Sequence, residues 1–305
     1  MNIAVTGGAG FIGSHLVEEL IKDGHNVKII DNLSSGKKSN VPEKAELIRK
    51  DIKEDNLCDE FEDLSTVFHF AANPKVNTFP EDRDKDFEEN LGGVKNVVDA
   101  VCETHVENLI FASSSAVYGE NAEIPTSESS EMNPISMYAA TKCGGEHICQ
   151  VYSKTFNFDL TIVRLANIVG GRNRKGVVYD FLQKIKENPE KLTILGNGKQ
   201  KKSYLHVSDA VSGIMTAWKS DDVIFNIGSE DAIEVDTIAD IISDELEEDP
   251  EYEYTGGEKG WKGDVPEMRL SIEKLKAEGW NVKNKSRESV RRAVQNQESD
   301  SKGSI

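Results

Sequence analysis

The sequence predicts an α/β fold in which a doubly wound parallel sheet carries a second, smaller C-terminal lobe. Short apolar strand segments alternate with helical segments through the first half of the chain, and such alternation is typical of parallel sheets. The first strand leads into a glycine-spaced turn that opens a helix. The second half is less regular, and 305 residues suffice for one large α/β domain with an extra lobe.

The turn after the first strand, Ile3–Val5, carries regularly spaced glycines. Gly7, Gly10 and Gly13 permit a tight turn, a close backbone approach to a ligand and a helix that lies near the strand. The helix expected over residues 11–22 would present free N–H groups to a pyrophosphate. A strand–turn–helix whose glycines serve packing alone is the alternative, and the glycine pattern by itself does not exclude it.

A second strand, Val27–Ile30, ends at Asp31. The Asp31 carboxylate lies 18 residues beyond Gly13, close to the spacing at which an acidic side chain binds the ribose of a dinucleotide. A plain packing turn has no need of this acidic residue. Strand, glycine turn and acid together therefore predict a dinucleotide-binding site at the start of the chain.

Further elements continue the alternation. Strands are expected at Leu47–Arg49, Thr66–Phe70, Asn108–Phe111, Leu160–Arg164 and Phe225–Ile227, and helices at Glu81–Cys102, Pro134–Phe156 and Ser208–Val223. Ligands bind beyond the carboxyl ends of parallel strands, so residues that directly follow a strand should gather at one edge of the sheet. These residues are Gly7, Asp31, Asp51, Ala71, Ser114 and Asn167.

The change from regular to irregular alternation sets the expected domain boundaries. Residues 1–165 plus 206–228 should form the dinucleotide-binding domain, and residues 166–205 plus 229–294 the smaller lobe. Residues 295–305 are polar and rich in small side chains, so we expect them to form a disordered tail.

Composition excludes several functional classes. The chain has 36 Lys and Arg against 54 Asp and Glu, a net charge of −18, which argues against nucleic acid as a partner. No apolar stretch approaches the roughly 20 residues that a membrane span needs. Met1 leads directly into the first strand, and the four cysteines lack metal-ligand spacing. We therefore expect a cytoplasmic protein with reduced thiols, no metal site and no membrane partner.

Three side chains suggest proton transfer beside the dinucleotide site. Tyr138 and Lys142 stand four residues apart on a predicted helix and share a face with Glu146, and Ser114 follows the neighbouring strand. Each alone is more often packing or a solvated surface group. A tyrosine that acts as a base near pH 7 needs its pKa lowered by about three units, or ~4 kcal/mol. Lys142 and an oxidised nicotinamide ring would supply the positive charge.

Motifs along most of the chain carry a family likeness. They are Thr6–Ser14, Asp31–Gly36, Asp51–Ile52, His69–Ala72, Ser113–Gly119, Tyr138-x-x-x-Lys142, Arg164–Asn167, Gly196–Gln200 and Gly263–Pro266. With them, over all but its tail, the chain resembles the extended short-chain dehydrogenases/reductases, which have a Rossmann fold. Among these it is most similar to the NAD-dependent epimerase/dehydratase family, and there to archaeal-type UDP-glucose 4-epimerases.

The resemblance implies a role for each matching residue. NAD would be bound by Gly7, Gly10, Phe11, Ile12, Gly13, Asp31, Asn32, Asp51, Ile52, Ala71 and Ala72, together with Tyr138 and Lys142. The catalytic residues would be Ser114, Tyr138 and Lys142, with Tyr138 as the base. The nucleotide sugar would be bound by Ser114, Asn167, Lys202, Asp264 and Met268. Lys202 stands where the family usually has arginine, and lysine lacks the two-pronged fork of a guanidinium.

The resemblance also implies a reaction. It would be 4-epimerisation of a UDP-sugar, either UDP-glucose and UDP-galactose or their N-acetyl forms, through a 4-keto intermediate. Related dehydratases and decarboxylases carry an acidic residue at the position of Ala116, so both reactions are disfavoured. A nucleotide-sugar 4-ketoreductase and, in another class, a non-catalytic NAD-binding regulator remain alternatives. Family members are commonly homodimers through a helix pair, here Glu81–Cys102 and Pro134–Phe156.

Overall fold

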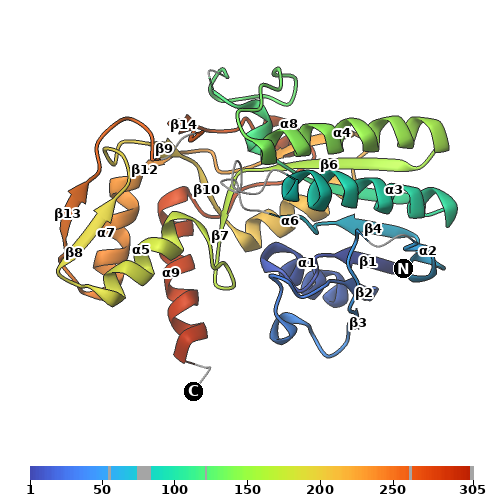
Figure 1. The fold of residues 1–305 in the computed structure, drawn as a ribbon, viewed down its shortest axis with the longest axis horizontal. Helices are drawn as coiled ribbons and strands as arrows, with labels where there is room; N and C mark the ends of the chain where they lie inside the picture. Colours follow the sequence, from blue (N-terminus) through green and yellow to red (C-terminus); the bar gives the residue numbers. More distant parts are fainter. Residues whose placement is uncertain (54–55, 74–83, 121, 261–262, 303–305) are drawn as a thin grey trace. The chain divides into compact units, whose positions relative to one another are not determined.

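The computed structural model describes residues 1–53, 56–73, 84–120, 122–260 and 263–302 (Figure 1). The chain divides into two compact units. The first consists of Met1–Gly119, Glu131–Arg164 and Ile214–Phe225, and the second of Glu120–Ser130, Leu165–Gly213 and Asn226–Ile305. These bounds differ from the predicted domains chiefly at residues 120–130 and 206–213, which the sequence analysis assigned to the dinucleotide-binding domain.

The first unit is built on a seven-stranded sheet with the order β11-β6-β5-β4-β1-β2-β3. The strands are β1 (Asn2–Thr6), β2 (Asn26–Ile30), β3 (Glu46–Ile48), β4 (Thr66–His69), β5 (Asn108–Ser114), β6 (Asp159–Leu165) and β11 (Ile224–Ile227), the last of which ends in the second unit. The pairs β1–β2, β1–β4, β2–β3 and β4–β5 are parallel. The strand order reverses beside β1, as in doubly wound dinucleotide-binding sheets, which confirms the predicted fold class.

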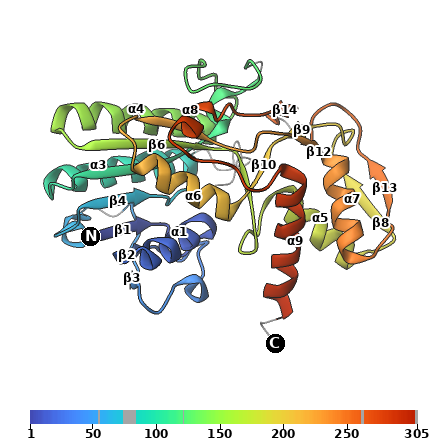
Figure 2. The same cartoon turned by 180° about the vertical axis from the view of Figure 1, so that it is seen from behind.

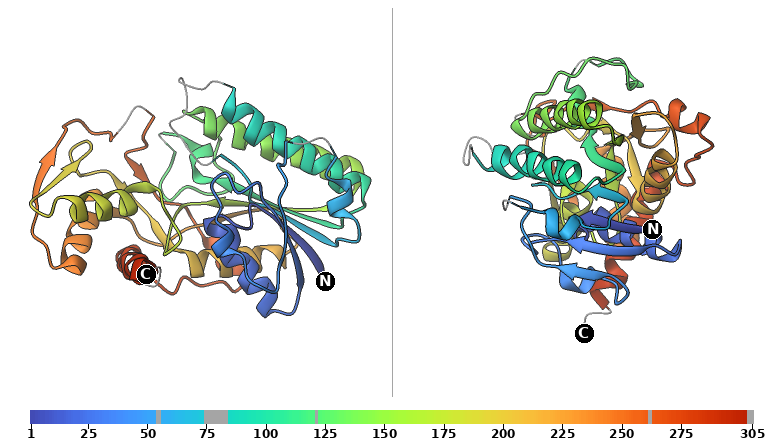
Figure 3. Two further views of the ribbon diagram at one scale, coloured as in Figure 1. Left: turned by 60° about the horizontal axis from the view of Figure 1, so that its bottom comes forward. Right: turned by 90° about the vertical axis from the view of Figure 1, so that its right-hand side faces the viewer.

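Helices cover both faces of this sheet. They are α1 (Phe11–Lys22), α2 (Cys58–Phe61), α3 (Gly93–Glu103), α4 (Met137–Phe156) and α6 (Val207–Trp218), with shorter turns at η1 (Lys38–Asn40), η2 (Phe87–Gly92) and η3 (Ser115–Tyr118). In Figure 3, α3 and α4 lie side by side on one face, and α1 lies on the other. A sheet covered on both faces is buried throughout, which explains the nearly continuous apolar runs of its strands.

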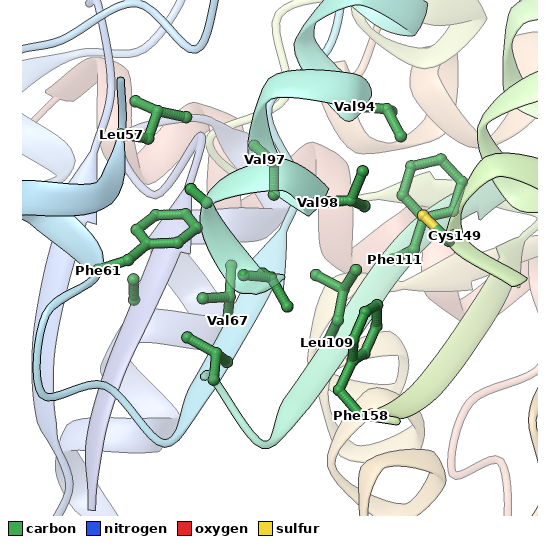
Figure 4. Packing of buried hydrophobic residues seen from close by; sticks show 14 of the residues in the cluster. Leu57, Phe61, Val67, Val94, Val97, Val98, Leu109, Phe111, Cys149 and Phe158 are labelled. Atoms are coloured by element: carbon green, nitrogen blue, oxygen red, sulfur yellow. The ribbon is translucent and has the colours of Figure 1, made fainter. Parts of the chain in front are cut away.

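One hydrophobic cluster of the first unit lies between α3 and the sheet (Figure 4). Val94, Val97, Val98 and Val101 recur at the spacing of one helix face, and all four are at most 2% exposed. They pack in one cluster with residues of β4 and β5, including Phe111. Burial of each valine contributes about 1.5–3 kcal/mol relative to exposure, so α3 depends on this face for its place on the sheet.

The helix predicted over Glu81–Cys102 has a wide turn near its start. Residues 81–83 lie outside the described part of the chain, and η2 is a π-helical segment that continues into α3. Asn90 in this segment is 3% exposed and accepts a hydrogen bond from the backbone N–H of Asn73 at 2.7 Å. Segments of this kind are frequent at functional sites, and here a polar side chain is buried where an apolar one would be expected.

In its described part, the second unit contains three small sheets, the first half of α6 and four further helices (Figure 2). The sheets pair β7 (Asn167–Val169) with β10 (Tyr204–His206), β8 (Lys191–Ile194) with β13 (Glu251–Tyr254), and β9 (Lys201–Lys202) with both β12 (Ile233–Glu234) and β14 (Glu267–Met268). The further helices are α5 (Gly176–Glu187), α7 (Val235–Leu246), α8 (Glu273–Ala277) and α9 (Ser286–Lys302). No helix among the described residues has the length and apolar character to cross a bilayer.

Helix α9 differs from the prediction of a disordered tail over residues 295–305. The helix continues to Lys302, and residues 303–305 lie outside the described part. Val290, Val294 and Gln297 follow one helix face and are at most 3% exposed. The Gln297 amide donates to the Gly170 carbonyl at 3.1 Å. Composition alone gave the wrong result for residues 295–302, because the helix is anchored by its preceding apolar turns and by one buried amide.

A buried histidine ends strand β4. His69 is 2% exposed, and its Nδ1 lies 2.8 Å from the Thr6 hydroxyl on β1. Burial, together with the charge of Lys142, lowers the pKa of His69 to about 3. His69 is therefore neutral in the folded protein over the whole physiological range, and its ring packs 5.7 Å from that of Phe111.

We expect His69 to make the fold sensitive to acid. In the unfolded chain His69 binds a proton below about pH 6.5, whereas in the folded chain it stays neutral until about pH 3. The free energy of unfolding therefore falls as the pH falls from 6.5 to 3. The wild type should lose about 1.4 kcal/mol more per pH unit than His69→Asn between pH 6 and 4. Denaturant unfolding at several pH values measures this slope, and parallel curves for the two proteins would contradict the prediction.

Candidate active site

The glycine turn between β1 and α1 is closed tightly by backbone. A Cβ on Gly7, which has φ +70°, would lie 2.7 Å from the Ala71 nitrogen, and a Cβ on Gly13 would lie 2.3 Å from the Gly7 oxygen. No other residue fits at either position. Gly10 is the N-cap of α1 and offers no side chain to its N–H groups. The free N–H groups of a helix N-terminus bind phosphate, so this turn fits the pyrophosphate of a dinucleotide.

Asp31 joins the end of β2 to this turn. The carboxylate is 8% exposed, and its two oxygens accept hydrogen bonds from the backbone N–H groups of Ala9 at 3.0 Å and Leu33 at 2.8 Å. The Asn32 amide donates to Asp51 at 2.9 Å. The three predicted polar residues therefore lie together beside the glycine turn, where a carboxylate would meet ribose hydroxyls.

The remaining residues predicted to bind NAD are divided between the turn and the core. Phe11 and Ile12 open α1, and the backbone N–H of Ala71 donates to the Thr6 hydroxyl at 3.2 Å, with Ala72 next in the chain. Ile52 is 8% exposed and belongs to the core cluster, where a Cβ on Gly93 would meet its side chain at 2.4 Å. The Ile52 side chain thus packs against α3.

Ser114, Tyr138 and Lys142 are brought together in the first unit. Ser114 ends β5, and its side chain is hydrogen-bonded to Tyr138 near the start of α4. The Lys142 ammonium lies 5.9 Å from the centre of the Tyr138 ring and donates to the Ala112 carbonyl at 2.9 Å. Ser136 caps the helix by accepting from the Ala139 N–H at 3.2 Å, which fixes the turn that carries Tyr138.

The side chains around Tyr138 make it a weaker acid than expected. Burial raises the pKa of Tyr138, the hydrogen bond from Ser114 opposes this rise, and the charge of Asp86 adds to it. Burial lowers the pKa of Lys142 to about 8. From the sequence we expect positive charge to lower the pKa of Tyr138, but the protein without cofactor raises it, because desolvation of the phenolate dominates.

A buried polar network beside Tyr138 is not among the features predicted from the sequence. The Asn73 amide donates to Asp86 at 2.9 Å, and the Asn90 amide lies 3.3 Å from the Thr141 hydroxyl, which donates to the Tyr138 carbonyl at 2.9 Å. The network ties the loop after β4 to the first turn of α4. The available signal was the pair of polar residues, Asp86 and Asn90, four apart on the face that α3 buries.

The residues predicted to bind the nucleotide sugar, apart from Ser114, gather around β9 in the second unit. The Asn167 amide donates to the Ser203 carbonyl at 3.0 Å. Lys202 forms an ion pair with Asp264, and the two side chains are 20% and 7% exposed. Met268 pairs with Lys202 across the parallel strands β9 and β14. Lysine, amide, carboxylate and thioether thus lie on neighbouring backbone segments.

Known proteins that are similar to this chain in sequence and fold carry the names of UDP-sugar 4-epimerases. The chain is 34% identical to a putative UDP-glucose 4-epimerase of Methanocaldococcus jannaschii, covering 96% of this chain and 97% of that one. A crystal structure of a UDP-galactose 4-epimerase is 40% identical and has a TM-score of 0.91, covering 98% of this chain and 99% of that one. The UDP-glucose 4-epimerase of Thermus thermophilus, solved in complex with NAD, is 32% identical with a TM-score of 0.90 and the same coverage. Residues 3–228 match the sequence pattern of the NAD-dependent epimerase/dehydratase family, and the chain belongs to that family.

Proposed function

We propose that this protein is an NAD-dependent isomerase that inverts C4 of the sugar in a UDP-sugar, with UDP-glucose and UDP-galactose as its principal pair. The observation that carries the proposal is the contact of Ser114 with Tyr138, with Lys142 one helical turn away. The epimerase names of the similar proteins support the same reaction. A direct test is to incubate the purified protein with UDP-galactose, without added cofactor, and to measure UDP-glucose.

The first unit would hold NAD through the residues already described. The N–H groups at the start of α1 would bind the pyrophosphate, Asp31 the adenosine ribose, and Lys142 the ribose next to the nicotinamide. Bound NAD supplies the acceptor and donor of the C4 hydride and, when oxidised, a positive charge. A Cβ on Gly7 or Gly13 would clash with the backbone of Ala71 or of Gly7, so these glycines keep the turn tight and hold the start of α1 close to the end of β1.

Tyr138 would act as the base on the sugar 4-hydroxyl. Its Oη would take the proton from that hydroxyl and later return it to the same oxygen, so the reaction releases and consumes no proton. Ser114 would hold the sugar oxygen in line by a second hydrogen bond. Because burial raises the pKa of Tyr138, ionisation requires the positive charges of Lys142 and the oxidised cofactor. The base would therefore form only in the loaded enzyme.

Ala116 favours epimerisation over dehydration or decarboxylation. It lies in η3, and its backbone N–H donates to the Ser114 hydroxyl at 3.2 Å. A methyl group at this position supplies no proton, whereas elimination of water requires an acid. A nucleotide-sugar 4-ketoreductase could use the same three side chains but would release its cofactor in each cycle, so NAD retained through purification would favour the epimerase.

In the second unit, Lys202 and Asn167 would face the diphosphate and Asp264 the nucleotide. Lys202 already has Asp264 as its partner, so a bound diphosphate would share the ammonium with a carboxylate. Lysine binds phosphate as a point charge and lacks the bidentate fork of arginine. We therefore expect moderate affinity for the UDP-sugar, with specificity set mainly by the shape of the sugar pocket.

Tyr138→Phe should abolish epimerisation and leave NAD binding intact, because only the ionisable hydroxyl is removed. We expect kcat to fall by at least about 10³-fold. Tyr152→Phe is the matched control, since Tyr152 lies on the same helix and its hydroxyl donates to Asp99 at 2.9 Å, away from the trio. Coupled assay of UDP-glucose formation gives kcat, and turnover of Tyr138→Phe near that of the control would exclude Tyr138 as the base.

The protein should bind NAD at least about tenfold more tightly than NADP, because the Asp31 carboxylate accepts from ribose hydroxyls and repels a 2′-phosphate. In Asp31→Asn the ratio of the two affinities should approach one. Asp23→Asn, an exposed change just after α1, is the control. Calorimetric titration with both dinucleotides measures the ratio, and equal wild-type affinities would contradict the role of Asp31.

Met268→Tyr should reduce activity on N-acetylated UDP-sugars more than on UDP-glucose. Methionine adapts its shape, whereas tyrosine would fill space beside the sugar C2 substituent and reject the larger group by clash. We expect wild-type protein to act on UDP-galactose and, more weakly, on its N-acetyl form. The measurement is the ratio of kcat/KM for UDP-galactose to kcat/KM for its N-acetyl form. If Met268→Tyr leaves this ratio unchanged, Met268 is not part of the pocket wall.

A further inference from the structure

A buried ion pair joins β6 to α4, the helix that carries Tyr138 and Lys142; these two residues and Ser114 are called the trio below. Arg164 on β6 and Glu146 on α4 are 3% and 1% exposed. The Arg164 Nη2 and Nε atoms donate to the two Glu146 oxygens at 2.7 and 2.9 Å. Burial opposes the charge of Arg164, but the hydrogen bonds and charge of Glu146, together with the contact with Tyr118, outweigh burial and raise the pKa of the guanidinium. The reaction proposed above makes no direct use of either group.

The pair ties together the elements that carry the trio. The Ser113 hydroxyl, immediately before Ser114, donates to Glu146. Arg164 Nη1 donates at 2.9 Å to the hydroxyl of Tyr118, in the turn that follows Ser114. Glu146 stands one helical turn beyond Lys142 on the face of α4 that meets β5. The carboxylate thus contacts the strand of Ser114 from the helix of Tyr138 and Lys142.

The same carboxylate is the anion that faces Lys142 from its own helix. Two other titratable side chains near Lys142, His69 and Cys149, are neutral at physiological pH. On β4, burial lowers the pKa of His69 to about 3, and on α4 burial raises the pKa of the Cys149 thiol to about 12. Tyr138 stays protonated because burial raises its pKa, and Asp86 faces it from the segment before α3. The charge of Glu146 opposes the fall that burial causes in the pKa of Lys142.

We propose that Glu146 is a positioning residue that holds the Tyr138–Lys142 face of α4 in register with Ser114 through its contacts with Ser113 and Arg164. A pair that served stability alone would be replaceable by apolar side chains of similar volume, since buried ion pairs are often no better than such replacements. Apolar side chains would give Ser113 no acceptor and Lys142 no anion. The proposal concerns the site of the proposed function and rests on that function only for its kinetic readout.

The test compares Glu146→Gln with two other variants. Glu60→Gln is the control for loss of an ion pair in the same unit. Lys50 Nζ lies 2.9 Å from Glu60 Oε2, and the two side chains are 20% and 15% exposed. The double variant Glu146→Gln with Arg164→Met leaves no unpaired buried cation, so it should fold where the single variant does not. Melting temperature, kcat, KM and calorimetric affinity for NAD are measured from pH 6.5 to 9.5.

In the wild type, affinity for NAD and kcat should fall as Lys142 loses its proton near pH 8. Removing the anion lowers the pKa of Lys142, so both should fall at a lower pH in Glu146→Gln and in the double variant. At pH 7, kcat should drop about tenfold or more with KM changed less than about twofold, because misplacement of the trio affects the reaction rather than binding of the sugar. Glu60→Gln should change only the melting temperature.

A double variant with wild-type kcat and an unshifted pH dependence of NAD affinity would overturn the proposal. It would reduce the pair to a structural contact, even if Glu146→Gln alone unfolds. Absence of epimerisation in the wild type would refute the proposed function instead. In that case the pH dependence of NAD affinity still decides the role of Glu146.

Discussion

The burial of one lysine ammonium is the constraint around which the first unit is organised. Lys142 on α4 is 5% exposed, and its ammonium donates to the Ala112 carbonyl and lies 5.0 Å from the centre of the Phe111 ring. A cation so poorly hydrated requires compensation by charge and dipole. The Ala112 carbonyl supplies the dipole, and Glu146 supplies the charge from the next turn. The same ammonium lies 5.9 Å from the centre of the Tyr138 ring. The contacts that offset the desolvation cost of Lys142 therefore also hold its positive charge near the Tyr138 hydroxyl.

Much of the first unit could be predicted from the sequence, because local rules determine it. The alternation of strands and helices, the glycine turn and the acid at the end of β2 are all short-range patterns. Parallel strands then bring their carboxyl ends to one edge whatever the details of packing. The proximity of Ser114 to Tyr138 and Lys142 follows from that topology together with the four-residue spacing on α4.

The rest depends on burial and on contacts between distant segments, which a sequence pattern does not contain. The direction of the pKa shift of Tyr138 is set by desolvation, which no spacing reveals. The polar network of Asn73 and Asp86 joins a loop to a helix start, and its members are ordinary polar residues when each is taken alone. In the same way, the pairing of Lys202 with Asp264 crosses 62 positions of sequence. The prediction for residues 295–302 was wrong because their helix is fixed by partners elsewhere in the second unit.

The anchoring of α9 has a practical consequence for anyone who shortens or extends this chain. Val290 and Val294 belong to the core shared with α5 and α7, and the Asn296 amide oxygen accepts a hydrogen bond from His206 Nε2 on β10 at 3.1 Å. Trimming the polar C-terminal segment on the basis of its composition would remove Gln297 and fray the helix beneath this core. A purification tag or fusion partner belongs after the last turn, and a chain shortened for crystallisation should end no earlier than Lys302.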